Sequence, residues 1–186
     1  GIPTLDLKRQ YGEIQAEVRA AIERVCASQQ FVLGPEVEAL EQEIAQYVGV
    51  KHAVGCASGT DALWLALAAA RVGTGDRVIT TPFSFFASAS SIVRTGAEPV
   101  FVDIDPGTLN IDTKAVARAL ERGSNVRSQA TNTKSPANNR GGLRSSGRAK
   151  AAVPASTRVK ALLPVHLYGQ CADMKAVRAI ADRHKL

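Results

Sequence analysis

The residues Ser58, Gly59, Thr60 and Asp61 stand directly before a strongly apolar stretch that has the composition of a buried helix. A helix N-terminus offers unpaired backbone N–H groups and a partial positive charge. Gly59 leaves the backbone open to an anion, and the two hydroxyl groups could add hydrogen bonds, so the segment predicts a phosphate site. The same S-x-x-D pattern is typical of a capping box, which any helix can use at its start. The spacing alone leaves both interpretations open.

A second group of residues with chemical potential is aromatic. Phe83, Phe85 and Phe86 follow an expected strand at residues 77–81. In an open α/β sheet, ligands bind beyond the carboxyl ends of the strands, where an aromatic ring could stack on a planar cofactor. The alternative, which composition favours, is that all three rings belong to the hydrophobic core.

Other polar residues at strand ends give weaker signals. Asp103 and Asp105 could act as an acid and a base, but a solvated turn before Pro106 explains them as well. His166 ends a later strand and is either a polar group of a site or a structural residue. The three histidines and three cysteines show no spacing typical of metal ligands, so we expect no metal site.

The elements that must position these residues alternate along the chain. Apolar periodicity and turn signals predict helices and strands in turn. The helices are expected at 8–28, about 37–47, 58–71, 86–94, 113–121 and 173–184, and the strands at 52–56, 77–81, 99–103 and 160–165. This order predicts an α/β fold with a mostly parallel sheet flanked by helices.

One segment breaks the alternation. Residues 122–158 contain eight Lys and Arg residues and no Asp or Glu, and they lack aromatic residues. Outside this segment 15 basic and 17 acidic side chains nearly balance, so the net charge of +6 comes from it alone. Such a composition buries too little apolar surface to offset the entropy of ordering. We predict a basic, disordered insertion at 122–158 between a larger part at 1–121 and its continuation at 159–186.

Composition also limits the class of protein. The chain has 186 residues, 45% of them hydrophobic, which is ordinary for a globular domain. Its longest apolar run has nine residues, too few to cross a bilayer. No signal peptide is visible, and an odd number of cysteines without a C-x-x-C pair argues against a disulfide scaffold and fits a reducing compartment. We therefore expect a cytoplasmic protein without membrane contact.

Five stretches, in this order and spacing, resemble the DegT/StrS-type sugar aminotransferases. They are 31–37 (FVLGPEV), 57–63 (ASGTDAL), 80–85 (TTPFSF), 99–105 (PVFVDID) and 163–170 (LPVHLYGQ). Each stretch alone is a weak signal, but five in order are specific. The resemblance covers residues 1–121 and 159–186.

The resemblance implies an incomplete large domain of the type I pyridoxal phosphate fold, similar to aspartate aminotransferase. It implies a homodimeric enzyme that uses pyridoxal 5'-phosphate to move an amino group, often from glutamate, to a nucleotide-linked keto-sugar. Such sugars enter polysaccharides and antibiotics. By the same resemblance, Ser58, Gly59 and Thr60 hold the cofactor phosphate, Phe85 stacks on the pyridine ring, and His166 lies beside the cofactor.

The sequence also departs from the family pattern. None of its eight lysines has the context of the family's Schiff-base lysine, and the aspartate that pairs with the pyridinium nitrogen has no counterpart. We therefore expect this chain alone to be inactive in transamination. The alternatives are a sugar dehydratase of the same family or a non-catalytic remnant. A remote alternative, nucleic-acid binding through 122–158, lacks aromatic residues to stack on bases.

Overall fold

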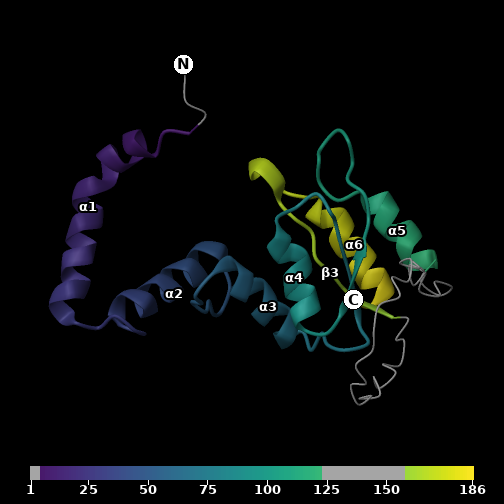
Figure 1. Ribbon diagram of the computed structural model, residues 1–186, viewed down its shortest axis with the longest axis horizontal. Helices are drawn as coiled ribbons and strands as arrows, with labels where there is room; N and C mark the ends of the chain where they lie inside the picture. The colour runs from purple at the N-terminus through teal and green to yellow at the C-terminus, as the bar shows by residue number, and fades with distance from the viewer. Residues whose placement is uncertain (1–4, 123–157) are drawn as a thin grey trace, which may run out of the picture. The chain divides into compact units, whose positions relative to one another are not determined.

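The computed structural model describes residues 5–122 and 158–186. Contacts divide the chain into two compact units, Gly1–Cys56 and Ala57–Leu186. The first unit is helical, and the second holds a small sheet flanked by helices (Figure 1). None of the described helices is long and apolar enough to cross a membrane. Residues 123–157, nearly all of the predicted insertion, lie outside the described residues, so the disorder expected there stays a prediction.

Two helices, α1 (Leu7–Ser28) and α2 (Pro35–Val48), make up most of the first unit. Pro35 begins α2. Its missing N–H group costs no hydrogen bond there, because the first N–H groups of a helix have no partner within the helix. A Cβ atom at Gly34 would lie 2.6 Å from the carbonyl oxygen of Gln30, so the chain can turn this tightly only with glycine there. The helix break predicted at Gly34 and Pro35 is therefore confirmed.

The strand predicted at residues 52–56 is wrong, because this segment is irregular in the structure. A strand exists through hydrogen bonds to a neighbouring strand, and all three strands of the described sheet pair elsewhere. The segment is held instead by a side chain of α2. The N–H group of Gly55 donates to Oε1 of Glu41 at 2.6 Å.

The second unit follows the predicted alternation closely. Its strands are shorter than the sequence indicated, and its helices match within a few residues. The elements are α3 (Gly59–Ala69), β1 (Arg77–Thr80), α4 (Phe86–Arg94), β2 (Glu98–Phe101), α5 (Thr113–Arg122), β3 (Val159–Leu162), the 3-10 turn η1 (Leu167–Gly169) and α6 (Met174–His184).

The three strands form a parallel sheet in the order β2-β1-β3. All four residues of β1 are buried, since it is the central strand and both its faces are covered. The predicted α/β fold with a parallel sheet is confirmed. The parallel direction matters for function, because it brings the segments after all three strands to one edge of the sheet.

Two apolar clusters cover the two faces of the sheet. Val78 packs with Leu67 of α3 and Ile92 of α4, whereas its neighbour Ile79 packs with Val116 of α5 and Val177 of α6. Successive strand residues point to opposite faces, so β1 serves both clusters. Figure 1 draws α4 on one side of β3 and α5 and α6 on the other. Each fully buried Val or Ile contributes about 1.5–3 kcal/mol, so this layered core fixes the edge that follows the strands.

Candidate functional site

The start of α3 has the geometry that both interpretations of Ser58 required. Ser58 is the N-cap residue, and its Oγ accepts the N–H of Asp61 at 3.2 Å. The N-cap role of Ser58, one half of the capping box, is therefore confirmed. Gly59 and Thr60 are the first two helical residues, whose N–H groups have no carbonyl one turn earlier within the helix. A Cβ atom at Gly59 would meet nothing within 4 Å, so no side chain crowds the backbone on that side of Gly59.

An ion pair at the start of α3 changes its electrostatics. The carboxylate of Asp61 lies 2.8 Å from Nη1 of Arg94, and the Arg94 guanidinium also lies 4.1 Å from the ring centroid of Trp64. The hydrogen bond from Arg94, and then that from Ser58, holds the pKa of the Asp61 carboxyl below its ordinary value. Asp61 is therefore an anion at neutral pH. The arginine beside it offsets a charge that would otherwise oppose an incoming phosphate.

The aromatic residues after β1 are exposed, so the interpretation of all three as core residues is wrong. Phe83 is 42% exposed, and Phe85 and Phe86 are 77% exposed. Phe85 is the N-cap residue of α4, and its backbone, not its side chain, begins that helix. The ring is consequently available to a planar partner, as stacking on a cofactor requires.

A cavity of about 530 Å³ with an almost wholly apolar lining runs along α4. Thr60 lines it together with residues along α4, from Phe86 at the start of the helix to Arg94 at its end. Thr60 belongs to the predicted phosphate site, and Phe86 is the neighbour of Phe85. The structure thus places residues next to Gly59 and next to Phe85 around one hollow.

His166 lies in the segment after β3, at the same edge of the sheet. It is exposed, and its Nδ1 accepts the N–H of Ala172 at 3.1 Å. In a neutral imidazole the proton then lies on Nε2. Two residues further, Tyr168 has a positive φ of 51° and is 82% exposed. Its ring meets that of Phe83 edge to face, with 6.4 Å between centroids. The aromatic surface at this edge is therefore wider than the sequence indicated.

The turn after β2 explains Asp105 without catalysis. Its Oδ1 accepts the N–H groups of Gly107 and Thr108 at 2.9 and 3.0 Å. This is the solvated turn that the sequence favoured. A carboxylate used in this way holds a loop in place.

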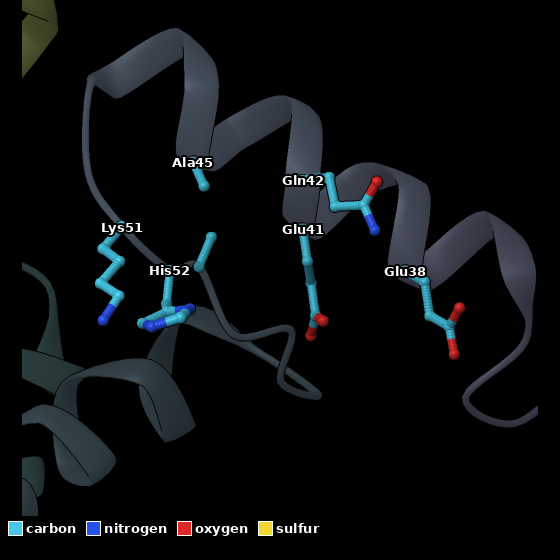
Figure 2. A pocket seen from close by; sticks show the side chains of 7 residues that line it. Glu38, Glu41, Gln42, Ala45, Lys51 and His52 are labelled. Atoms are coloured by element: carbon cyan, nitrogen blue, oxygen red, sulfur yellow. The ribbon is translucent and has the colours of Figure 1, made fainter.

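The first unit has its own hollow, of about 220 Å³ (Figure 2). Glu38, Glu41 and Gln42 line it from α2, and Lys51 and His52 line it from the segment that follows. Over residues 5–122 and 158–186, no group of three or more His, Cys, Asp or Glu side chains is arranged to hold a metal ion. The Glu41 carboxylate is already bonded to Gly55, so this hollow has a structural explanation.

Comparison with known proteins shows the family to which this chain is related. Residues 12–127 and 142–186 match the DegT/DnrJ/EryC1/StrS aminotransferase family. This chain belongs to that family. The match leaves residues 128–141 uncovered, a shorter stretch than the predicted insertion.

Two curated relatives illustrate the similarity. The chain is 45% identical to the pleiotropic regulatory protein of Geobacillus stearothermophilus, over 100% of this chain and 40% of that protein. It is 38% identical to the UDP-2-acetamido-2-deoxy-3-oxo-D-glucuronate aminotransferase of Pseudomonas aeruginosa, over 98% of this chain and 41% of that enzyme. The chain thus spans about 40% of the length of the curated relatives it matches.

Solved structures of the family share the fold. A DegT/DnrJ/EryC1/StrS aminotransferase from Brucella abortus superposes with a TM-score of 0.80 at 31% identity, over 100% of this chain and 42% of that one. NtdA from Bacillus subtilis, solved with bound cofactor PMP, gives 0.74 at 26% identity, over 100% and 35%. The α/β fold described above is therefore that of aminotransferases.

The residues present fit the phosphate and ring of such a cofactor. Phosphate prefers backbone N–H groups at a helix N-terminus and hydroxyl donors, and the start of α3 offers both beside open space. One hydroxyl is engaged, because Oγ of Ser58 donates to Oδ2 of Asp61 at 3.1 Å. The N–H groups of Gly59 and Thr60 would consequently be the main donors to a phosphate.

Three features of the site had escaped the sequence analysis. The Arg94–Asp61 pair joins residues 33 positions apart, and the Phe83–Tyr168 contact joins two strand ends. The third is Asn110, whose buried amide contacts the segment after His166. The sequence offered one signal for Asn110, which is that this amide stands between two apolar residues, Leu109 and Ile111.

Proposed function

We propose that this chain forms the phosphate-binding and ring-binding edge of a pyridoxal phosphate-dependent aminotransferase that acts on a nucleotide-linked keto-sugar. The observation that carries the proposal is the open helix start at Gly59, whose neighbour Thr60 shares a cavity with the start of α4 beside the exposed Phe85. The Pseudomonas relative, a UDP-sugar aminotransferase by name, supports the substrate class.

Each residue has a stated task in this proposal. The N–H groups of Gly59 and Thr60 donate to the phosphate, and the Ser58 hydroxyl adds a donor when it turns from Asp61. Phe85 covers one face of the pyridine ring. His166 lies beside the ring with its Nε2 protonated, because Nδ1 accepts from Ala172. The chemistry that the bound cofactor supplies is an electron sink, which allows an amino group to leave one carbon skeleton and join another.

Two further catalytic groups of the family are not assigned to any residue of this sequence. The chain spans about 40% of the length of its relatives, and we propose that the cofactor-binding lysine and the aspartate that pairs with the pyridinium nitrogen belong to the remaining part. The 186-residue chain is then expected to bind cofactor weakly and to give no transamination by itself.

Equilibrium dialysis with pyridoxamine phosphate tests the proposal directly, because this form needs no lysine. We expect saturable binding that inorganic phosphate competes for, and a loss of at least tenfold in affinity in Gly59→Asp. Absence of saturable binding to the wild-type protein would overturn the assignment of the site. In parallel, glutamate and a UDP-linked or dTDP-linked 3-keto-sugar are added, and amination by the chain alone would overturn the predicted inactivity.

The remaining expectations belong to the same proposal. We propose a homodimer in a reducing cytoplasm with glutamate as amino donor, and one cofactor-binding domain built from residues 1–121 and 159–186. Cys26 and Cys171 are exposed and form no disulfide, which supports a reducing compartment. Analytical ultracentrifugation tests the dimer, and a monomer at micromolar concentration would contradict it.

A further inference from the structure

The segment after β3 carries His166 and Tyr168, yet it has little regular structure to hold it. A one-turn 3-10 helix, η1, is its only element, and Tyr168 inside that turn has φ 51°. A bulky residue is strained in this region of conformational space and persists only when its surroundings hold it. Contacts from outside the segment must therefore fix its shape.

Asn110 makes these contacts with one side chain. Its Oδ1 accepts the N–H of Leu167 at 3.3 Å, and its Nδ2 donates to the carbonyl oxygens of Gln170 and Cys171 at 3.3 and 3.4 Å. The residue is only 4% exposed. The oxygen and the nitrogen of the side-chain amide are thus both hydrogen-bonded. Their partner residues lie 57 to 61 positions away in the chain.

Asn110 is itself held firmly by the turn after β2. Its carbonyl oxygen accepts the N–H of Asp105 at 2.8 Å, and its neighbour Ile111 is buried and bridges to Ile104. An amide on a fixed backbone can impose its geometry on a less regular segment. We therefore expect the turn after β2 to determine the conformation of the segment after β3.

The bridged residues flank the hydrogen bond that sets the tautomer of His166. Leu167 follows His166, and Cys171 precedes Ala172, whose N–H donates to Nδ1 of His166 at 3.1 Å. Asn110 holds Leu167 and Cys171, and so it fixes the separation of the imidazole from the Ala172 N–H. Without the amide, the two ends would keep the bond from the Gln170 N–H to the Leu167 carbonyl oxygen, at 3.0 Å, but would lose the three bonds to Asn110.

We propose that Asn110 is a positioning residue that sets the tautomer and orientation of His166 for cofactor binding. The inference rests on the proposed function, because that function places His166 beside the pyridine ring. Asn110 itself does not reach the cofactor in this proposal. It acts only through the segment that it holds.

Nitrogen-detected NMR of the imidazoles in the cofactor-free protein tests the proposal without any activity. In the wild type we expect His166 to be protonated mainly on Nε2. In Asn110→Ala we expect mixed tautomers and at least tenfold faster hydrogen exchange at the amide of Ala172. Asn110→Asp keeps the acceptor for Leu167 but sets a carboxylate against two carbonyl oxygens, so we expect a change at least as large. Gln170→Ala is the control, since only its main-chain carbonyl is bonded.

Pyridoxamine phosphate binding separates this inference from the proposed function. A changed tautomer with about fivefold weaker binding in Asn110→Ala supports the inference. An unchanged tautomer in a folded variant overturns it, and so does a changed tautomer with unaltered affinity. If both variants unfold without a selective change at 166–172, Asn110 is only structural and the inference is again wrong. If the wild type binds no pyridoxamine phosphate, the proposed function fails and the positioning role for the cofactor fails with it, while the NMR still decides whether Asn110 controls His166.

Discussion

The two edges of the parallel sheet use their polar residues differently. At the edge where the strands begin, charged side chains pair with one another. Nζ of Lys160 lies 3.0 Å from Oδ2 of Asp76 and also donates to the carbonyl oxygen of Arg71, and Nε of Arg77 lies 3.0 Å from Oε2 of Glu98. At the edge where the strands end, the aromatic rings of Phe83, Phe85 and Tyr168 are exposed.

This contrast separates stability from binding. Groups that satisfy one another within the fold lower its free energy, whereas groups that face outward are available to a ligand. Substitutions at the first edge should therefore change the free energy of unfolding and leave pyridoxamine phosphate affinity unaltered. Substitutions at the second edge should change pyridoxamine phosphate affinity and leave the free energy of unfolding unaltered.

Gly59→Asp should give the largest effect at the binding edge. A carboxylate at the first position of α3 favours the helix dipole, so stability is kept or slightly raised. The same charge opposes a phosphate, and we expect an affinity loss on the order of 100-fold, or about 2.7 kcal/mol. Dialysis and thermal melting measure the two quantities. Gly59→Asn, which has the same shape without charge, should lose much less, and equal losses in both variants would contradict the electrostatic account.

Gly96→Ala should give the largest effect at the opposite edge. Gly96 has φ +86°, and a Cβ atom there would lie 2.5 Å from Oγ1 of Thr74. We expect a loss of about 2 kcal/mol in unfolding free energy, measured by urea denaturation, with unchanged ligand affinity in the folded protein. Gly73→Ala is the matched control, because its nearest contact is an ordinary 3.8 Å. Equal destabilisation by both would show that strain at Gly96 is not the cause.

Phe85→Leu should weaken binding more modestly. An aromatic stacking contact contributes about 1 kcal/mol, so pyridoxamine phosphate affinity should fall about fivefold. The ring is 77% exposed, so the melting temperature should not move. Phe85→Tyr keeps the ring and should retain affinity. A loss in the tyrosine variant as large as in the leucine variant would exclude stacking.

Asp76→Asn should give the smallest effect, visible at neutral pH and vanishing in acid. Burial raises the pKa of this carboxyl, but hydrogen bonds from Lys160 and the Gly73 N–H, and the charges of Lys160 and Arg158, outweigh it and lower the pKa below 3.8. The group therefore stabilises the fold above pH 3.8, and this contribution is lost as the pH falls through the lowered value. Asp76→Asn should lower the free energy of unfolding by about 1 kcal/mol at neutral pH. It should also reduce the fall in unfolding free energy as the pH drops into the acid range.

Urea titrations at several pH values measure this change. Asp182→Asn is the control, because Asp182 pairs with Arg178 on an exposed helix face, where ion pairs contribute little. A pH dependence unchanged by Asp76→Asn would show that the Asp76 pair does not matter for stability.

Local patterns predicted most of the second unit. The apolar spacing around Val78 and Ile92 located buried elements, and the S-x-x-D pattern located the start of α3. Residues 52–56 were assigned wrongly because alternation of side chains cannot reveal whether a neighbouring strand exists. Composition favoured burial of Phe85 for a related reason, since hydrophobicity predicts burial on average but not at a particular position.

The features that remained hidden are contacts between distant segments. Arg94 reaches Asp61, and Asn110 reaches Leu167, only after the parallel sheet has brought their elements together. Such pairs leave no periodic trace in a single sequence. The family resemblance supplied Phe85 and His166 as candidates, but the geometry around His166 came from the structure alone.

The strand order β2-β1-β3 has a consequence for handling the protein. Both outer strands, Glu98–Phe101 and Val159–Leu162, have one side without a neighbour in the described sheet. The backbone amides and carbonyls on those sides form templates onto which extended chain can add. Preparations of this polypeptide should consequently tend to self-associate edge to edge as concentration rises, and extra strands supplied in trans should suppress that tendency.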